Sequence, residues 1–486
     1  MKRPMLLCAA ISIVSAFAVF YHSYAIFAAV IVVAVAALLS LSGKLPQRLL
    51  ISVLCSVLVL LGISLNLLKL SRLESHTGKE LCEEFVIIEQ PFATSSGFYA
   101  DAVCISDNTL KVGDKLRLFY SHCDLNVGDT VYAQLKLSDL NDSSYKKSCF
   151  SKGIYASGYV SSLKAAATKN TLLCTIPRLR REISKILGSA DISYKAKSLI
   201  SAVIAGDKSN ISDEFDYLVK ASGTSHMLVV SGMHLVILMG GITRLLERIF
   251  YNKYVYAAMS LFLVLLIMAI CGFTMSVIRA GIMYLTVAAA PLFGRDSDAL
   301  NTLGFTVCLI IAFTPFAIFS ISLQLSAMST LGILLLTRFI TEKALFALNI
   351  VNPIAIKLTE AVAVTLSATV MTAPICIYHF GYLSTVSIIS NLLATYAVTA
   401  LLLVGAMGIS AGLVFGQGLI SQAFLYLAGV CAEYTVKVIE FFGSLSFAIL
   451  PLPDFTVPLF TVLAISTSLL RYVERKRNYI ISRRTY

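Results

Sequence analysis

One stretch of the sequence concentrates the residue types that chemistry needs. Residues 223–235 read GTSHMLVVSGMHL, with two histidines and two serines in a chain dominated by aliphatic side chains. Serine paired with histidine can act as a nucleophile, and histidine is a common metal ligand. Inside a membrane, the same polar groups typically line a route for a substrate. The stretch therefore raises three hypotheses: a hydrolase site, a metal site and a polar passage.

The hydrolase and metal hypotheses both lack partners in the sequence. Ser231 and His234 could meet across one helical turn, but no nearby carboxylate orients the histidine, and VVSGM is not a G-x-S-x-G nucleophile elbow. His226 and His234 would lie about 80° apart around an ideal helix, and no third ligand follows closely. We therefore expect no catalytic residue, cofactor or metal here. Gly223 and Gly232 instead favour a broken or tightly packed helix.

Other polar side chains interrupt apolar segments farther along the chain. Arg279 lies within GFTMSVIRAGIMYLTVAAA, and an arginine at the centre of a membrane helix costs about 2.5–3.5 kcal/mol on insertion scales. Arg279 is therefore expected to face a cavity, a cluster of carbonyls or a bound anion. Gln324, His379 and Asn391 lie in similar surroundings. A structural hydrogen bond explains each of them alone, but together they predict a polar route through a helix bundle.

The composition places these residues in a membrane protein. The 486 residues are 57% hydrophobic and 14% charged, with a mean hydropathy of +0.82, whereas soluble domains carry about 25% charged residues. The net charge of +12 is explained first by lysines and arginines in cytoplasmic loops, which fix membrane topology. The charge alone therefore does not indicate nucleic-acid binding.

Residues 1–69 predict transmembrane helices. They hold three apolar runs, and Lys2 and Arg3 precede the first. The first run resembles a signal peptide, but a second apolar run follows at once, so we interpret it as a retained helix. The positive residues before the first run and between the second and third favour a cytoplasmic location for both segments. The region after the third run is then expected outside.

Residues 70–165 predict a small β domain. DTVYAQLKL (129–137) alternates apolar and polar residues like a half-buried strand. Two Val-Gly-Asp turns, each before a strand pattern, suggest a small β-barrel. The region is not basic, with ten Lys/Arg against twelve Asp/Glu. Its four cysteines either pair as disulfides, in one of three ways, or remain buried thiols: Cys82, Cys104, Cys123 and Cys149.

The rest of the chain is predicted to be helical. Residues 166–222 form an amphipathic bridge, in which PRLRREISKILG predicts a basic helix from Pro177 to Gly188 at the membrane surface. Residues 223–472 predict a polytopic helix bundle with spans centred near residues 235, 263, 284, 310, 329, 368, 394, 408, 428 and 462. Residues 473–486 form a basic tail, expected in the cytoplasm. With both termini inside, ten to twelve spans are expected.

Four blocks, in order along the chain, resemble the ComEC family of competence proteins. The first, SAVIAGDKSNISDEFDYLVKASGTSHMLVVSGMHLVIL (201–238), has a Gly-Asp-Lys-Ser turn before a His…Ser-Gly-x-His stretch. CGFTMSVIRAGIMYLTVAAAPLFGRDSDALNTLGF is similar to the second block, SLQLSAMSTLGILLL to the third and TAPICIYHFGYLSTVSIISNLLA to the fourth. YKKSCFSKGIYASGYV (145–160) resembles the end of the family's outer domain. The resemblance covers nearly the whole chain.

The resemblance implies a polytopic α-helical membrane protein with a small extracytoplasmic β-barrel (OB-like) domain. It implies a multi-pass protein of the bacterial cytoplasmic (inner) membrane, with both termini in the cytoplasm. Its function would be a channel for uptake of single-stranded DNA during natural transformation, without enzymatic activity on this chain. By position, the polar route or its structural core would comprise Asp207, His226, Ser231, Gly232, His234, Arg279, Gln324, His379 and Asn391.

The resemblance also implies partners. These are single-stranded DNA, membrane lipids, a surface DNA receptor, a cytoplasmic helicase or translocase, and a separate nuclease. Many members carry a C-terminal β-lactamase-like metal nuclease domain, but the six histidines of this chain cannot supply its ligand motif. Aromatic residues of the outer domain either stack on DNA bases or fill the domain core: Phe98, Tyr99, Phe119, Tyr120 and Tyr132.

The sequence departs from the family in places and leaves other functions open. Met275 stands where proline is usual, and Ser322 and Ala327 replace the usual Gly and Phe around Gln-Leu-Ser. These differences bear on the local geometry of the route and not on the family resemblance. The main alternative is a transporter or flippase for another anionic envelope substrate, which Arg279 would also suit. An intramembrane hydrolase that uses Ser231 and His234 is the second alternative.

Overall fold

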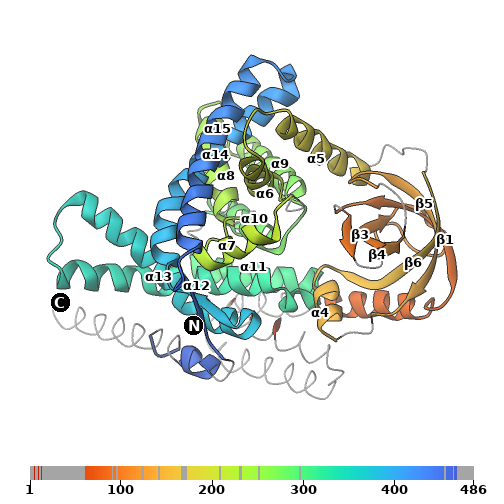
Figure 1. The fold of residues 1–486 in the computed structure, drawn as a ribbon. Coiled ribbons are helices and arrows are strands. Elements are labelled where there is room, and N and C mark those ends of the chain that lie inside the picture. Colours follow the sequence, from red (N-terminus) through yellow and green to blue (C-terminus); the bar gives the residue numbers. More distant parts are fainter. Residues whose placement is uncertain are drawn as a thin grey trace.

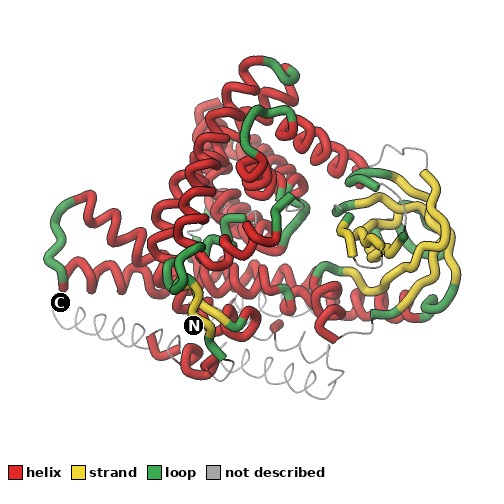
Figure 2. Tube along the Cα trace, in the orientation of Figure 1, coloured by secondary structure: helices red, strands yellow, loops and turns green. Residues whose placement is uncertain are grey.

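The computed structural model describes residues 5, 9, 12 and 13 and then residues 61–467. Short gaps lie at 90, 95–96, 122–124, 141–142, 166–171, 207–209, 229–231, 250–251, 295–296, 454–455 and 463–464. These residues form a domain of strands beside a larger helical part (Figures 1 and 2). Most of the predicted N-terminal helices and the whole basic tail lie outside the described residues.

The first part is a β domain. Its strands are β1 (Glu80–Ile87), β2 (Phe92–Thr94), β3 (Gly97–Cys104), β4 (Lys115–Tyr120), β5 (Thr130–Ser138) and β6 (Ile154–Ala165), and helix α4 (Ser143–Ser151) separates the last two. The sheet order is β1-β5-β6-β4-β3-β2, with a further pairing between β1 and β3. The pairings therefore run from β1 through β5, β6, β4 and β3 and back to β1, a cycle of five strands. Among the described strands, only β4 and β6 pair in parallel.

Strand β5 confirms the alternation read from the sequence. Val131, Ala133, Leu135 and Leu137 are at most 1% exposed, whereas Tyr132 is 41% exposed. A strand sends successive side chains to opposite faces, so the apolar set faces one core. That core also takes side chains from β1, β3 and β4.

An aromatic contact ties the β domain to the helical part. Phe316 lies in the short 3₁₀ helix η2 (Pro315–Phe319) and is 2% exposed. Its ring centroid lies 5.2 Å from that of Phe150 and 5.9 Å from that of Tyr155. The Tyr155 hydroxyl donates to Asn66 Oδ1 (2.7 Å), on the helix formed by residues 61–74. Phe316 therefore completes the β-domain core from outside the domain.

Helix α5 (Leu172–Gly188) makes a second tie. Arg180 donates to the carbonyls of Ile88 (3.2 Å) and Ala205 (3.3 Å), and Arg181 donates to the carbonyl of Val127. These two arginines therefore join the domains. Figure 1 shows α5 running from the helical part to the edge of the β domain.

The structure corrects two features predicted for this segment. The helix extends back at least to Leu172 and carries Pro177 inside it, rather than beginning there. Its apolar face is not left for the membrane surface, because Ile183, Ile186 and Leu187 are each at most 4% exposed and pack inside the protein. Burial of that face offsets the one backbone hydrogen bond that a proline removes.

Among the described residues, ten α-helices of the helical part precede a short helical segment at residues 457–462. These are α6 (Tyr194–Ala205), α7 (Asp213–Ser222), α8 (Gly232–Ile249), α9 (Lys253–Ile270), α10 (Met275–Ala289), α11 (Ala299–Phe313), α12 (Ile321–Ala347), α13 (Pro353–Phe380), α14 (Ser387–Phe415) and α15 (Leu419–Gly443). The pairs α12–α13 and α14–α15 make the most extensive helix contacts. In Figure 1 the α12–α13 pair points away from the β domain, and α14–α15 rises beside α6 and α7.

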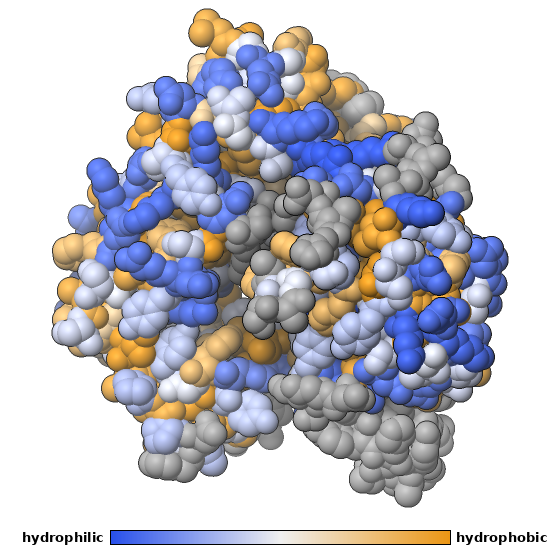
Figure 3. Space-filling view, turned by 45° about the vertical axis from the view of Figure 1, so that its right-hand side comes forward, coloured by the Kyte–Doolittle hydropathy of each residue, from blue (hydrophilic) through white to orange (hydrophobic). Residues whose placement is uncertain are grey.

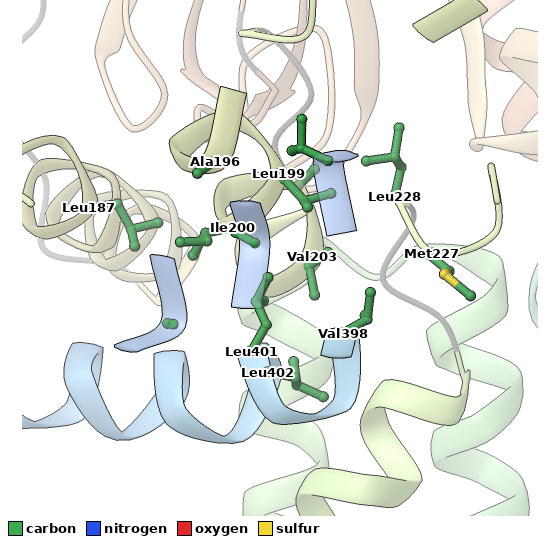
Figure 4. Packing of buried hydrophobic residues seen from close by; sticks show 14 of the residues in the cluster. Leu187, Ala196, Leu199, Ile200, Val203, Met227, Leu228, Val398, Leu401 and Leu402 are labelled. Atoms are coloured by element: carbon green, nitrogen blue, oxygen red, sulfur yellow. The ribbon is translucent and has the colours of Figure 1, made fainter. Parts of the chain in front are cut away.

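The largest core lies where α14 and α15 pack on α5 and α6. Leu199, Ile200 and Val203 of α6 are fully buried against Val398 and Leu401 of α14 (Figure 4). Met227 and Leu228, from the connection between α7 and α8, join the same cluster. These two residues anchor the polar stretch at residues 223–235 in the main core.

Four helices of the described chain, α12 to α15, are long and apolar enough to cross a membrane. In each of these helices, between 17% and 39% of an apolar 18-residue stretch is buried inside the protein. Much of the surface of the four helices is therefore free to face lipid. Figure 3 shows hydrophobic side chains near the top of the view, around the turn that joins α14 and α15, and hydrophilic ones along the right edge, over the β domain. α14 runs unbroken through residues 394 and 408, so the two spans predicted there are one helix.

Candidate polar route through the helical part

The N-terminus of α10 positions Arg279. The chain enters this helix through a turn in which Gly272 and Phe273 have positive φ values of 72° and 53°. Met275 is the first residue of the helix. Proline suits that position because the first N–H of a helix has no partner inside the helix. Most residues can occupy it, so Met275 in place of the family's proline is accommodated without altering the helix start.

Arg279 is a buried cation held by weak acceptors. It is 7% exposed. Its Nε donates to the Ser326 hydroxyl of α12 (2.8 Å), and its Nη1 lies 3.2 Å from the sulfur of Met283. The Ser326 hydroxyl also lies 3.0 Å from that of Ser276. Among the described residues, no carboxylate forms an ion pair with Arg279.

Gly232 lies directly against this guanidinium. A Cβ at Gly232 would stand 2.9 Å from Arg279 Nη2 and 2.9 Å from the Cβ of Ala280. Real Cβ atoms do not approach other atoms that closely, so the contact requires glycine. The first two sequence blocks therefore meet at Gly232 and Arg279, and Ser326 adds the third.

A second contact joins the third and fourth blocks. His379 Nε2 lies 3.1 Å from Gln324 Oε1. Gln324 Nε2 donates to the carbonyl of Ile318 (2.7 Å) at the end of η2. His379 is exposed and Gln324 is half-buried, so this pair reaches the surface of the helical part.

A third contact joins the end of α7 to the start of α14. The Ser390 hydroxyl donates to the carbonyl of Ser222 (2.6 Å), and Gly223, at φ 74°, packs against Ser387. Asn391 follows and is 8% exposed. Within the described structure its Oδ1 accepts no hydrogen bond, which is unusual for a buried polar atom.

The other candidates lie in different surroundings. His234 is completely buried in α8, and His226 is exposed in the turn between α7 and α8. Asp207 and Ser231 lie outside the described residues, so the Ser231–His234 hypothesis stays open. Among the described residues, no group of three or more metal-ligating side chains is placed to hold an ion.

Sequence reasoning missed two hydroxyls: that of Ser326, which accepts from Arg279, and that of Ser276, which contacts Ser326. Ser276 lies three residues before Arg279, and Ser326 lies two after Gln324. Small hydroxyl residues within apolar helices commonly mark close helix packing and hydrogen bonds between helices. That signal was present in SVIRA and QLSAMS, but it could not indicate which pairs meet.

The β domain carries a row of aromatic side chains across four strands. Phe92 is paired with Tyr99, Tyr99 with Phe119, and Phe119 with Tyr159 in strand register. Their ring centroids lie 5.5, 6.0 and 5.2 Å apart in that order. Phe92 and Tyr159, at the ends of the row, are 60% and 55% exposed. We call these four residues the aromatic row.

The aromatic residues noted in the sequence therefore fall into two groups, those inside the aromatic row and those outside it. Tyr99 and Phe119 belong to the row, whereas Tyr120 is 6% exposed and stacks on Phe98. Tyr132 is exposed on β5, outside the row. Phe92 and Tyr159 were missed because they lie in a short strand and in a Gly-Tyr-Val run without clear alternation.

A buried ion pair lies against Tyr99, an inner ring of the aromatic row. Arg117 donates from Nε and Nη2 to both carboxylate oxygens of Asp101, at 2.6 and 2.8 Å. Its guanidinium also lies 4.6 Å from the ring centroid of Tyr99. Burial alone would lower the pKa of Arg117, but the hydrogen bonds and charge of Asp101 raise it above its usual value. The cation is therefore permanent and neutralised by Asp101.

The cysteines of the β domain are free thiols where the structure describes them. Cys104 and Cys149 are buried and Cys82 is exposed. Burial raises the pKa of both Cys104 and Cys149. Cys123 lies outside the described residues, so a disulfide that includes it stays a prediction.

Comparison with known proteins gives two matches. Residues 203–477, more than half of the chain, match the competence protein family. ComE operon protein 3 of Bacillus subtilis (strain 168) is 22% identical over 263 residues. That alignment covers 54% of this chain and 32% of the relative, so the chain spans about a third of the relative's length. No solved structure matches significantly.

Proposed function

Because this chain belongs to the competence protein family, we propose that it is a membrane channel for uptake of single-stranded DNA during natural transformation. A polyanion crosses an apolar layer only along a path with polar groups and modest positive charge. Tight binding at any point would stall it. The helical part supplies such groups on α8, α10, α12 and α13.

The observation that carries this proposal is the meeting of distant polar residues. Gly232 packs against Arg279, and Arg279 donates a hydrogen bond to Ser326. Gln324 lies two residues before Ser326 on the same helix, and its side chain is hydrogen-bonded to His379. Residues from four separate sequence blocks thus form a connected set inside apolar helices. Polar groups at membrane depth are costly and typically line a functional path.

The β domain fits the handling of a single strand. The cycle of pairings through five strands supports an OB-like barrel, an architecture that commonly binds oligonucleotides. The aromatic row offers flat, partly exposed rings to unpaired bases, and stacking does not depend on base identity. We propose that the strand passes the aromatic row before it enters the helical part.

We further propose the cellular setting. The protein lies in the bacterial cytoplasmic membrane as a multi-pass protein, with the β domain outside and both termini inside. It works with a surface DNA receptor, a cytoplasmic helicase or translocase that supplies the energy, and a separate nuclease. The chain itself performs no chemical step.

The test is entry of labelled DNA into the cytoplasm of a deletion strain. DNA bound at the surface is removed with nuclease before measurement. The wild-type gene is expected to restore entry, while surface binding is the same with and without it. Equal entry with and without the gene would refute the proposal. The alternative transporter of an anionic envelope substrate would then be favoured, since Arg279 would suit any anion.

A further inference from the structure

Arg279 has hydrogen-bonding capacity that its neighbours leave unused. A guanidinium carries five N–H donors, and the described acceptors are one hydroxyl on Nε and one thioether near Nη1. Among the described residues, none accepts a hydrogen bond from Nη2. That nitrogen instead faces Gly232, which has no side chain.

We infer that the Nη2 edge of Arg279 is a binding site for one phosphate group of the DNA backbone. This rests on the proposed function for the source of the phosphate, but not for the anion chemistry. An arginine within apolar helices usually pairs with a carboxylate or lines a polar path, and the described residues offer it no carboxylate. A phosphate oxygen would accept from the unused donors, and planar guanidinium groups suit phosphate.

Ser326 and Ser276 position the guanidinium for that contact. The two hydroxyls lie 3.0 Å apart, and Ser326 receives the Nε donor. This fixes the plane of the guanidinium from the α12 side. The Met283 thioether is a weak acceptor, so Nη1 can exchange it for a phosphate oxygen at little cost. One cation with neutral neighbours binds each phosphate loosely enough to release it.

Gly232 allows the α8 backbone to lie directly against the guanidinium. A Cβ at this position would stand 2.9 Å from Nη2, too close for both groups to keep their places. A methyl group there would displace the guanidinium or cover its donors, without changing any charge. Gly232→Ala and Arg279→Gln therefore test the same site by different means.

The test uses the purified full chain in lipid nanodiscs. The probe is a fluorescent single-stranded oligonucleotide with a phosphodiester backbone, compared with the same sequence carrying an uncharged methylphosphonate backbone. Variants are Arg279→Gln, Arg279→Lys and Gly232→Ala. The control is Arg338→Gln, because Arg338 lies on α12, is 81% exposed and already pairs with Glu342.

Arg279→Gln is expected to weaken binding of the phosphodiester probe about tenfold or more. It should also reduce the slope of log affinity against log salt concentration by about 0.7, the value for one phosphate contact with a single strand. Binding of the uncharged probe should not change. Gly232→Ala should give the same loss, Arg279→Lys an intermediate one, and Arg338→Gln none. Unchanged affinity and salt slope in a folded Arg279→Gln protein would overturn the inference. If Arg279→Gln fails to fold, unchanged phosphodiester binding by Gly232→Ala would do the same.

A second measurement separates this inference from the proposed function. Inorganic phosphate replaces chloride at equal ionic strength, and the melting temperature of the nanodisc protein is followed. If the wild type binds neither oligonucleotide, the DNA proposal fails. Stabilisation by phosphate that Arg279→Gln loses would still support an anion site at Arg279. No stabilisation of the wild type would overturn that site too.

Discussion

His379 Nε2 lies 3.1 Å from Gln324 Oε1, so one hydrogen bond ties the end of α13 to the start of α12. The residues are 55 positions apart in sequence. The Gln324 amide also donates to Ile318, which lies in the η2 segment that anchors the β domain. The pair therefore couples two apolar helices to the segment that meets the β domain.

If this contact shapes the route, its two members should act as a unit. Gln324→Ala and His379→Ala should each slow DNA entry severalfold. The double variant should be no slower than the slower of the two single variants, because the effects of mutating two residues in contact are not additive. Initial rates are measured at matched protein levels. Tyr378→Phe is the control, since Tyr378 is adjacent and 68% exposed. Losses that multiply in the double variant would show that the residues act separately.

The aromatic row predicts a separate effect in the β domain. Phe92→Ala and Tyr159→Ala should each weaken binding of a single-stranded oligonucleotide by about 1–3 kcal/mol, the usual value for one stacked base. Both side chains are more than half exposed, so folding should be little affected. Tyr132→Ala removes an exposed ring outside the row and should leave oligonucleotide binding unchanged. Equal losses in all three variants would argue for non-specific contacts instead.

Phe316 predicts how the two parts are held together. Phe316→Ala should lower the free energy of unfolding by about 3–5 kcal/mol, because it leaves a cavity in the β-domain core beside Phe150 and Tyr155. Hydrogen exchange should rise in β6 and η2 together, and protease should release the β domain faster. Phe313→Ala is the matched control, since that ring is 75% exposed three residues earlier. An increase in hydrogen exchange confined to η2 would mean that the β domain is stable without Phe316.

Local periodicity predicted much of the fold. β5 was identified within one residue of its ends, because one face of a half-buried strand must be apolar. α14 was divided into two predicted spans because its 29 residues contain no charged residue or proline to mark where a span ends. Its Gly405 and Gly412 suggest turns, yet each packs closely against a neighbouring isoleucine. Glycine indicates either a turn or a close contact, and sequence alone does not decide between them.

The candidate site was predicted as a set of residues but not as a set of contacts. Arg279, Gln324 and His379 stood out because polar groups are costly in apolar helices. That Arg279 meets Gly232 and Ser326 depends on how α8, α10 and α12 pack. Packing angles follow from side chains along whole helices, so no local pattern reveals such pairs.

The cysteines of the β domain predict a graded response to a thiol reagent. Cys82 is exposed and should react with a maleimide in the folded protein, whereas Cys104 and Cys149 are buried. Burial also raises the pKa of Cys104 and Cys149, which reduces the reactive thiolate at neutral pH. Mass spectrometry of each peptide, without reductant, should therefore find these two labelled only after unfolding. Cys82→Ser should remove the fast reaction at that peptide and leave the slow sites unchanged. If Cys104 or Cys149 stayed unlabelled after unfolding until a reductant was added, it would be in a disulfide, and Cys123 would be the first partner to test.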